Sequence, residues 1–317
     1  MIDVNGIQLH IAEQGQGPLV VLLHGFPESW HSWRHQFGPL AEAGFRVVAP
    51  DQRGYGGSDR PEDVSAYSIL HLVGDVVGLI HALGEERAFV VGHDWGAPVA
   101  WHCALTRPDL FHAVFGLSVP FQPRRVKGPP TAAMAVLARR AGLGELYINQ
   151  FQAPDAHRVF ETDVPAALRK GFYAYDGATP PEKQSTGFIP EGENFISTVP
   201  ADAPLPPWMT PAHFQEYVDA FSAGGFKGPL DWYRNLDRNW SLTAHLQDAR
   251  IRVPAAFVVG ERDPVRHYAG AHEAGLKDWA PDLRLQLVIP GAGHWIQQER
   301  PDEVNRLLLD FLGQVAT

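Results

Sequence analysis

The sequence predicts an α/β fold in which a doubly wound, mostly parallel sheet is interrupted by an inserted helical segment. Two observations lead to this prediction. Apolar runs of strand length alternate with helical patterns up to about residue 120 and again after about residue 245, which is typical of a parallel sheet covered by helices. Between these parts no run has the pattern of a buried strand. We therefore expect one core made of residues 1–120 and 246–317, with residues 121–245 inserted as a helical lid.

The first part of the chain contains the expected elements in order. Ile7, Leu9 and Ile11 alternate with polar or small residues, as in a strand with one exposed face. Residues 68–84 have apolar side chains at helical spacing, with Gly84 placed to end the helix. A continuous apolar run, as expected of a strand buried on both faces, stands at 19–23, and further strand patterns stand at 45–50, 88–92 and 113–117.

The middle and the end of the chain differ in pattern. Helix-like stretches occur at 131–149 and 212–223, and eight prolines between Pro180 and Pro211 predict an irregular loop. Two strand patterns and a closing amphipathic helix then follow, at 255–259, 285–289 and 301–314. Two tandem domains are the weaker alternative, because the last two strands would have no sheet of their own.

Composition excludes several classes of function. The chain has 317 residues, and its formal charge of −10 argues against binding to nucleic acids or anionic membranes, which need basic patches. Its one cysteine, Cys103, has no partner for an internal disulfide, which favours a reducing compartment. No signal peptide and no run of membrane-spanning length is evident. We therefore expect a cytoplasmic protein, and a homodimer stays open beside a monomer.

One stretch in the first part has the layout of a nucleophile elbow, G-x-Nu-x-G. The apolar run at 88–91 breaks at Gly92, and a helix-like run begins at Ala97. Gly92 and Gly96 lack the Cβ atoms that would clash in a sharp strand-to-helix turn. The central residue is Asp94, where serine is usual, and its side chain should stand in a pocket near the positive end of the next helix. Because Asp and Gly are common in ordinary turns, the motif gains weight only from its context.

Residues of catalytic type follow the last two strand patterns. Asp263 comes after the strand pattern at 255–259, and His294, between glycines and an aromatic residue, comes after the last strand pattern. The order nucleophile, acid, histidine is the chain order of α/β-hydrolases. Loops at the carboxyl ends of parallel strands converge, so Asp94, Asp263 and His294 are expected to meet. Glu261 is a rival to Asp263 as the acid.

Two other patterns suggest sites of a different kind. His31 and His35 stand four residues apart, a spacing that can place two metal ligands on one helix face, but no third ligand is evident. The glycine-rich run at 51–59 lacks the G-K-[ST] ending of a phosphate loop, which favours a structural loop beside the pocket. We therefore predict no metal and no cofactor.

Together these motifs resemble those of the soluble epoxide hydrolases of the α/β-hydrolase superfamily. The run His24–Pro27, His-Gly-Phe-Pro, is similar to the family's H-G-x-P oxyanion motif, and Gly92–Gly96 to its aspartate elbow. Residues 147–152 and 228–235 resemble the two lid segments that supply ring-opening tyrosines. The similarity covers nearly the whole chain and is weakest over Pro180–Pro211. It implies an α/β-hydrolase fold with an inserted helical lid, or cap.

The resemblance implies the hydrolysis of an epoxide to a vicinal diol by water alone. Asp94 would attack a ring carbon and form an alkyl ester, which water can cleave. His294, oriented by Asp263, would activate that water. Ring opening creates an alkoxide, and Tyr147 and Tyr233 would donate hydrogen bonds and a proton to it.

The resemblance also assigns residues around the substrate. The backbone N–H groups of Phe26 and Trp95 would stabilise the oxyanion that forms when the ester is cleaved. Aromatic candidates near the pocket imply a small apolar epoxide as the substrate. Those expected to bind it are Phe151, Trp232 and Trp295.

Two other functions are weighed against this one. Haloalkane dehalogenases also use an aspartate elbow followed by tryptophan, but they tend to have Asn or Glu where this chain has Phe26. Fluoroacetate dehalogenases do have H-G-F-P, yet they carry arginine where this chain has Trp95. A non-catalytic binding role is the third class, and it is disfavoured because the chain retains Asp94, Asp263, His294 and both tyrosines.

Overall fold

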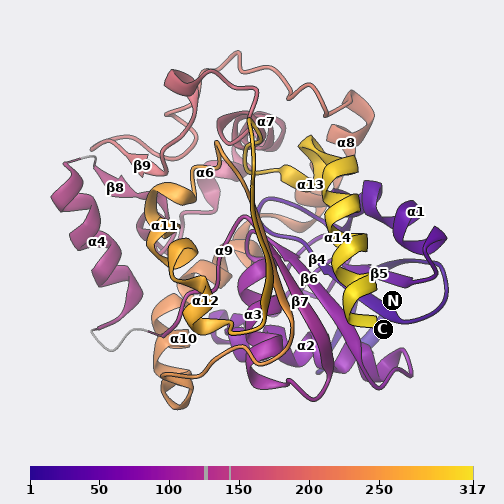
Figure 1. The fold of residues 1–317 in the computed structure, drawn as a ribbon. Coiled ribbons are helices and arrows are strands. Elements are labelled where there is room, and N and C mark those ends of the chain that lie inside the picture. Colours follow the sequence, from indigo (N-terminus) through magenta and orange to yellow (C-terminus); the bar gives the residue numbers. More distant parts are fainter. Residues whose placement is uncertain (125–127, 143, 317) are drawn as a thin grey trace.

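The computed structural model describes residues 1–124, 128–142 and 144–316 and contains a central seven-stranded sheet (Figure 1). Its strands lie side by side in the order β11-β10-β7-β6-β4-β5-β3. Neighbouring strands are parallel, except that β3 is antiparallel to β5. The predicted doubly wound, mostly parallel sheet is confirmed. The strands are β3 (Ile11–Gln14), β4 (Leu19–Leu23), β5 (Arg46–Pro50), β6 (Ala88–His93), β7 (Phe111–Leu117), β10 (Ala255–Gly260) and β11 (Leu283–Ile289).

The central strands are apolar throughout because their side chains alternate between two helical layers. In β4, Val20 and Leu22 belong to one core cluster, whereas Val21 and Leu23 belong to the other. Side chains of α1 and α14 complete the first cluster, and those of α2 and α3 contribute to the second. These helices are α1 (Arg34–Glu42), α2 (Ile69–Ala82), α3 (Gly96–Thr106) and α14 (Pro301–Ala316).

Shorter elements complete the part of the chain outside residues 121–245. A hairpin of β1 (Ile2–Val4) and β2 (Ile7–Leu9) precedes the central sheet. Helices α11 (Arg266–Ala274) and α12 (Leu276–Trp279) connect β10 to β11, and α13 (Ile296–Glu299) leads into α14. The 3₁₀ helices are η1 (Trp30–Trp33), η2 (Val64–Tyr67) and η4 (Ala244–Leu246), the last at the end of the middle segment.

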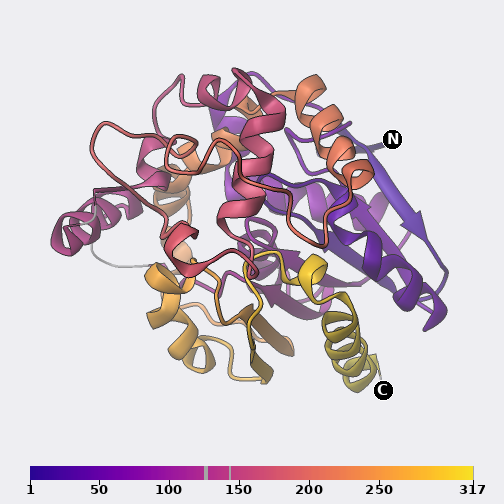
Figure 2. The ribbon, with the colours of Figure 1, turned by 90° about the horizontal axis from the view of Figure 1, so that it is seen from above.

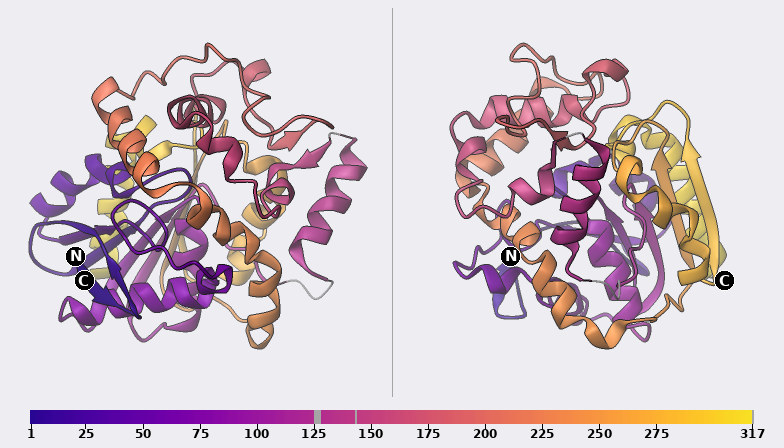
Figure 3. Two further views of the ribbon diagram at one scale, coloured as in Figure 1. Left: turned by 180° about the vertical axis from the view of Figure 1, so that it is seen from behind. Right: turned by 90° about the vertical axis from the view of Figure 1, so that its left-hand side faces the viewer.

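Residues 121–245 add no strand to the central sheet over the positions that the structure describes. Figure 2, seen from above, shows the segment spread over one end of the molecule, and Figure 3 shows α4 at its periphery. None of the helices described in the chain is long and apolar enough to traverse a bilayer. The elements of the segment are α4 (Pro130–Ala141), β8 (Glu145–Leu146), α5 (Tyr147–Gln150), α6 (Arg158–Glu161), α7 (Val164–Ala174), η3 (Pro181–Lys183), β9 (Phe188–Ile189), α8 (Pro211–Gly224), α9 (Lys227–Arg234) and α10 (Leu236–Leu242).

Two predicted elements are divided in the structure. The run from Ile7 to Ile11 was expected to be one strand, but the chain leaves the hairpin at His10, whose N–H donates to the Ser58 hydroxyl instead of a strand. The helix expected over 131–149 ends at Ala141, because Gly142 has a left-handed φ of 65° that a continuing helix does not allow. In contrast, the helix expected at 68–84 and the irregular course of Pro180–Pro211 are confirmed.

Candidate active site

The sharp turn after β6 presents Asp94 at the carboxyl end of the sheet. Asp94 has a left-handed φ of 48°, a conformation that non-glycine residues rarely adopt. A Cβ atom on Gly92 would overlap the Gly96 carbonyl oxygen, and one on Gly96 would overlap the Leu23 carbonyl oxygen. Both glycines are therefore required by close backbone contacts, as the elbow motif predicts.

The Asp94 carboxylate is held by the loop that follows β4. The Phe26 N–H donates to Asp94 Oδ1 at 2.7 Å. Gly25 permits this approach, because a Cβ atom there would overlap the Asp94 side chain. Trp95 caps α3, so its N–H is among the first N–H groups of that helix, which lack an acceptor within the helix. The two N–H groups expected to form an oxyanion site thus come from residues next to the carboxylate.

Asp94, His294 and Asp263 meet, although they are far apart in the sequence. His294 Nε2 lies 3.4 Å from Asp94 Oδ2, and His294 Nδ1 lies 3.1 Å from each carboxylate oxygen of Asp263. Glu261, the rival acid, instead accepts the Gly291 N–H at 2.9 Å. The structure therefore places Asp263, and not Glu261, beside His294.

The electrostatics of the triad favour a protonated histidine. Burial opposes protonation of His294, but the charges and hydrogen bonds of Asp263 and Asp94 outweigh it and raise the His294 pKa well above its usual value. Burial alone would raise the pKa of Asp263. The charge of His294, together with the hydrogen bonds that Asp263 makes to His294 and Ser118, lowers this pKa instead. The two carboxylates thus favour the cationic form of His294 in the resting site.

Ser118, which no sequence motif indicated, also contacts the triad. It directly follows β7 and is 1% exposed. Its hydroxyl donates to Asp263 Oδ2 at 2.6 Å and lies 2.9 Å from His294 Nδ1. The one signal available in the sequence is its place after a predicted strand, which Asp94, Asp263 and His294 share.

A buried pair of polar side chains, His93 and Glu28, lies under the site. His93 Nδ1 is 2.7 Å from Glu28 Oε2, and His93 Nε2 is 2.7 Å from the His294 carbonyl oxygen. Burial would raise the pKa of Glu28, but the charge and hydrogen bond of His93 lower it to about 2. The pair ties the backbone of His294 to the end of β6.

Glu299 fixes the loop on both sides of His294. Its carboxylate accepts the N–H groups of Gly293 at 2.7 Å and Trp295 at 2.9 Å, and that of Gly177 at 3.1 Å. Burial and the charge of Asp176 raise the pKa of Glu299 to about 7. This carboxylate therefore joins the histidine loop to the 121–245 segment.

Tyr147 in α5 and Tyr233 in α9 are brought together across the site. Their ring centroids are 6.1 Å apart, and both line the same cavities as Asp94. Burial raises the pKa of both hydroxyls, so both are O–H donors at neutral pH. Tyr268 of α11, which the sequence did not indicate, places its hydroxyl 3.4 Å from that of Tyr147.

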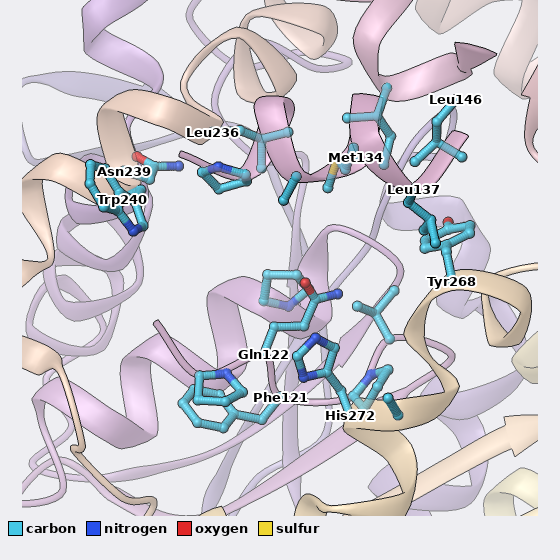
Figure 4. Close-up of a pocket in the computed structure, with 18 of the residues that line it drawn as sticks. Phe121, Gln122, Met134, Leu137, Leu146, Leu236, Asn239, Trp240, Tyr268 and His272 are labelled. Atoms are coloured by element: carbon cyan, nitrogen blue, oxygen red, sulfur yellow. The ribbon is translucent and has the colours of Figure 1, made fainter. Parts of the chain in front are cut away.

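The main cavity has a volume of about 1000 Å³ and is lined mostly by apolar side chains. It reaches from Asp94 and the tyrosines outward past α4, α10 and α11. Figure 4 shows Phe121, Gln122 and His272 on one wall of its outer part, and Leu236 and Trp240 on the opposite wall. A cavity of this volume and lining suits a largely apolar ligand.

A second cavity of about 20 Å³ lies beside Asp94 and His294, which is room for about one water molecule. Trp295 lines this small cavity, as expected of a residue near the substrate. Phe151 and Trp232, also expected to bind substrate, line neither cavity: Phe151 packs against the Tyr233 ring, and Trp232 donates to the Arg53 carbonyl oxygen. Their large rings are buried behind the lining residues, so we correct their expected role to support of the tyrosines and of Trp95.

The two histidines weighed as metal ligands lie in different helices, His31 in η1 and His35 in α1. His31 Nε2 lies 3.0 Å from His213 Nδ1 of α8. Among residues 1–124, 128–142 and 144–316, no group of three or more His, Cys, Asp or Glu side chains is placed to hold a metal ion. Cys103 is buried, and burial raises the pKa of its thiol, which leaves it unreactive.

Comparison with known proteins agrees with this geometry. Residues 18–301 match the family model of the alpha/beta hydrolase fold. The chain is 44% identical to epoxide hydrolase A of Mycobacterium tuberculosis, over 98% of this chain and 96% of that protein. It is 41% identical to epoxide hydrolase 3 of Siraitia grosvenorii, over 99% and 97% of the two chains.

Solved structures give the same result. An epoxide hydrolase from an endophytic Streptomyces superposes with a TM-score of 0.95 at 43% identity, covering 99% of this chain and 95% of that one. Epoxide hydrolase A from Mycobacterium thermoresistibile superposes with a TM-score of 0.88 at 42% identity, covering 98% and 96%. The chain belongs to the epoxide hydrolases of the α/β-hydrolase fold family.

Proposed function

We propose that this epoxide hydrolase opens its substrate through a covalent ester on Asp94 and cleaves that ester with water activated by His294. The observation that carries the proposal is the position of the Asp94 carboxylate between the Phe26 N–H and His294, in cavities shared with two tyrosine hydroxyls. A nucleophile, a base and two donors thus face one space.

In the first step, a carboxylate oxygen of Asp94 bonds to a ring carbon of the epoxide, and the ring C–O bond breaks. The departing oxygen becomes an alkoxide, which is strongly basic. Tyr147 or Tyr233 transfers a proton to it, and the other hydroxyl donates a hydrogen bond. Both hydroxyls stay protonated until this moment because burial raises their pKa.

Before the second step, His294 no longer faces a charged Asp94, and it gives its Nε2 proton to the tyrosinate left by ring opening. Water in the small cavity then attacks the carbonyl carbon of the ester and gives a proton to the neutral His294. The oxyanion receives hydrogen bonds from the N–H groups of Phe26 and Trp95. The acyl C–O bond then breaks, and the diol oxygen takes the proton back from His294. Ionisation of the regenerated Asp94 returns the remaining proton to His294, so the resting enzyme is restored and the net reaction is epoxide plus water to diol.

The two tyrosines distinguish this chemistry from dehalogenation. A halide leaves as a stable anion and needs no proton, whereas the alkoxide of an opened epoxide does. Two buried hydroxyl donors at the site are needed only if the substrate is an epoxide. The relatives described above, which are epoxide hydrolases, likewise do not favour the haloalkane alternative.

The middle segment of the chain and the walls of the main cavity support a lid over an apolar site. We propose residues 121–245 as the lid, since Tyr147 and Tyr233 both come from this segment. The apolar walls of the main cavity favour an apolar epoxide.

Since Cys103 is a buried thiol without a disulfide partner, a reducing compartment, the cytoplasm, is the proposed location.

Oxygen-18 labelling tests the covalent mechanism. In a single turnover with excess enzyme in ¹⁸O water, the label should enter the Asp94 carboxylate, and the first diol should be unlabelled. The reason is that one oxygen of the diol comes from the epoxide and the other from the Asp94 carboxylate, where an oxygen from water then takes its place. Peptide mass spectrometry locates the label. Label in the first diol would mean that water attacks the epoxide directly.

The pH dependence should differ between the two steps. Ester formation removes the Asp94 charge, one of the groups that raise the His294 pKa, so this pKa falls and His294 becomes a base. Below that pKa His294 is protonated and hydrolysis slows, while ring opening continues. Lowering the pH from about 8 to about 5 should therefore increase the fraction of enzyme present as ester, measured by quenching at steady state and intact-mass analysis. An ester fraction that stays constant or falls would contradict this assignment.

A further inference from the structure

Ser118 occupies a strained position at the end of β7. Its φ is 69°, in the left-handed region that residues other than Gly, Asn and Asp seldom adopt. The residue is 1% exposed, so no solvent interaction explains the conformation. Such backbone outliers persist where the surrounding structure requires the side chain in that place.

The hydroxyl of Ser118 bridges the acid and the base of the triad. It donates to Asp263 Oδ2 at 2.6 Å and lies 2.9 Å from His294 Nδ1. Both distances are shorter than the 3.1 Å between His294 Nδ1 and either Asp263 oxygen. A hydroxyl whose proton is donated to Asp263 has only lone pairs to offer His294, so it accepts the Nδ1–H.

We propose that Ser118 is a positioning residue that fixes the tautomer and ring orientation of His294 for ester hydrolysis. The inference rests on the proposed function, because it acts on the step that His294 catalyses. With Nδ1–H held by Ser118 and Asp263, Nε2 faces Asp94 and the small water-sized cavity, and it is this nitrogen that loses its proton once the ester has formed. Ser118 also keeps Asp263 ionised by donating to it. It has no contact with the Asp94 oxygens through which ring opening starts.

The test separates the two steps in Ser118→Ala. Rapid-quench experiments should show an unchanged rate of ester formation, within about twofold, and a rate of ester hydrolysis reduced about 10–100-fold, the range for one hydrogen bond to a charged group. Ser118→Gly should give the same hydrolysis rate as Ser118→Ala, because glycine relieves the left-handed backbone but also lacks the hydroxyl. Ser58→Ala, which removes another buried hydroxyl, that of Ser58 bonded to the Asp51 carbonyl oxygen, is the control and should leave both rates unchanged.

A double-mutant cycle with Asp263→Asn shows whether Ser118 acts through the acid. In the Asp263→Asn background, Ser118→Ala should slow hydrolysis by less than about threefold, because the charge that Ser118 supports is gone. Hydrolysis by Ser118→Ala within twofold of the wild type, or an equal loss in both steps, would overturn the positioning role. Failure of the proposed function has a different result: no ester would form in the wild-type enzyme at all.

Discussion

Replacing both ring-opening tyrosines with phenylalanine should nearly abolish ester formation, while each single replacement should remove only part of the rate. A donor to a developing oxyanion contributes about 10²–10³-fold. Since Tyr147 and Tyr233 would share one oxygen, each covers in part for the other, and the double variant should lose at least about 10³-fold. Single-turnover formation of the ester, followed by quenched-flow mass spectrometry, measures the loss.

Two controls belong to this experiment. Tyr67→Phe removes a buried hydroxyl that donates to the Pro61 carbonyl oxygen, and it should leave the rate unchanged. Circular dichroism should show the same fold in all variants. Wild-type rates in the double variant, or faster turnover of haloalkanes than of any epoxide, would refute the assignment of the tyrosines.

In His294→Gln, ring opening should still occur once and the ester should accumulate. Without a base, hydrolysis should slow by about 10²–10⁴-fold, so the covalent enzyme becomes the dominant species. Its intact mass should rise by the whole mass of the epoxide, because ring opening loses no atom. Alkylation by a haloalkane would add less than the reagent mass, since halide leaves, and the measurement therefore also identifies the chemistry.

His81→Gln is the matched control for this variant, because His81 is exposed on α2. It should turn over normally and show no adduct. If His294→Gln is folded but never gains mass, His294 is required for ring opening as well, and the division of roles between the two steps is wrong.

Local patterns predicted the sheet and the nucleophile turn correctly. A continuous apolar run such as 19–23 specifies a strand buried on both faces, since both helical layers need apolar contacts. Gly92 and Gly96 specify the elbow, because steric overlap within a few residues excludes any side chain there. These effects depend on residues that are neighbours along the chain, so they can be predicted from the sequence.

Contacts between distant segments were decided only by the tertiary structure. Asp263 and Glu261 both follow β10, and packing alone places the first beside His294 and the second on Gly291. Trp232 is an aromatic residue of the kind that lines apolar pockets, but it is buried behind the residues that line the cavity. Which aromatic ring faces a cavity depends on how helices pack, and periodicity does not encode it.

Ser118 illustrates the same limit for the site itself. A serine after a strand is not part of any recognisable motif. The contacts that give its hydroxyl a role are to Asp263 and His294, which lie 145 and 176 positions further along the chain. By itself the sequence determined the fold class, the nucleophile turn and the order of nucleophile, acid and histidine, because strand burial and turn sterics are local. The tertiary structure decided which side chains touch within the triad, because those contacts form only when β6, β7, β10 and β11 are aligned in one sheet.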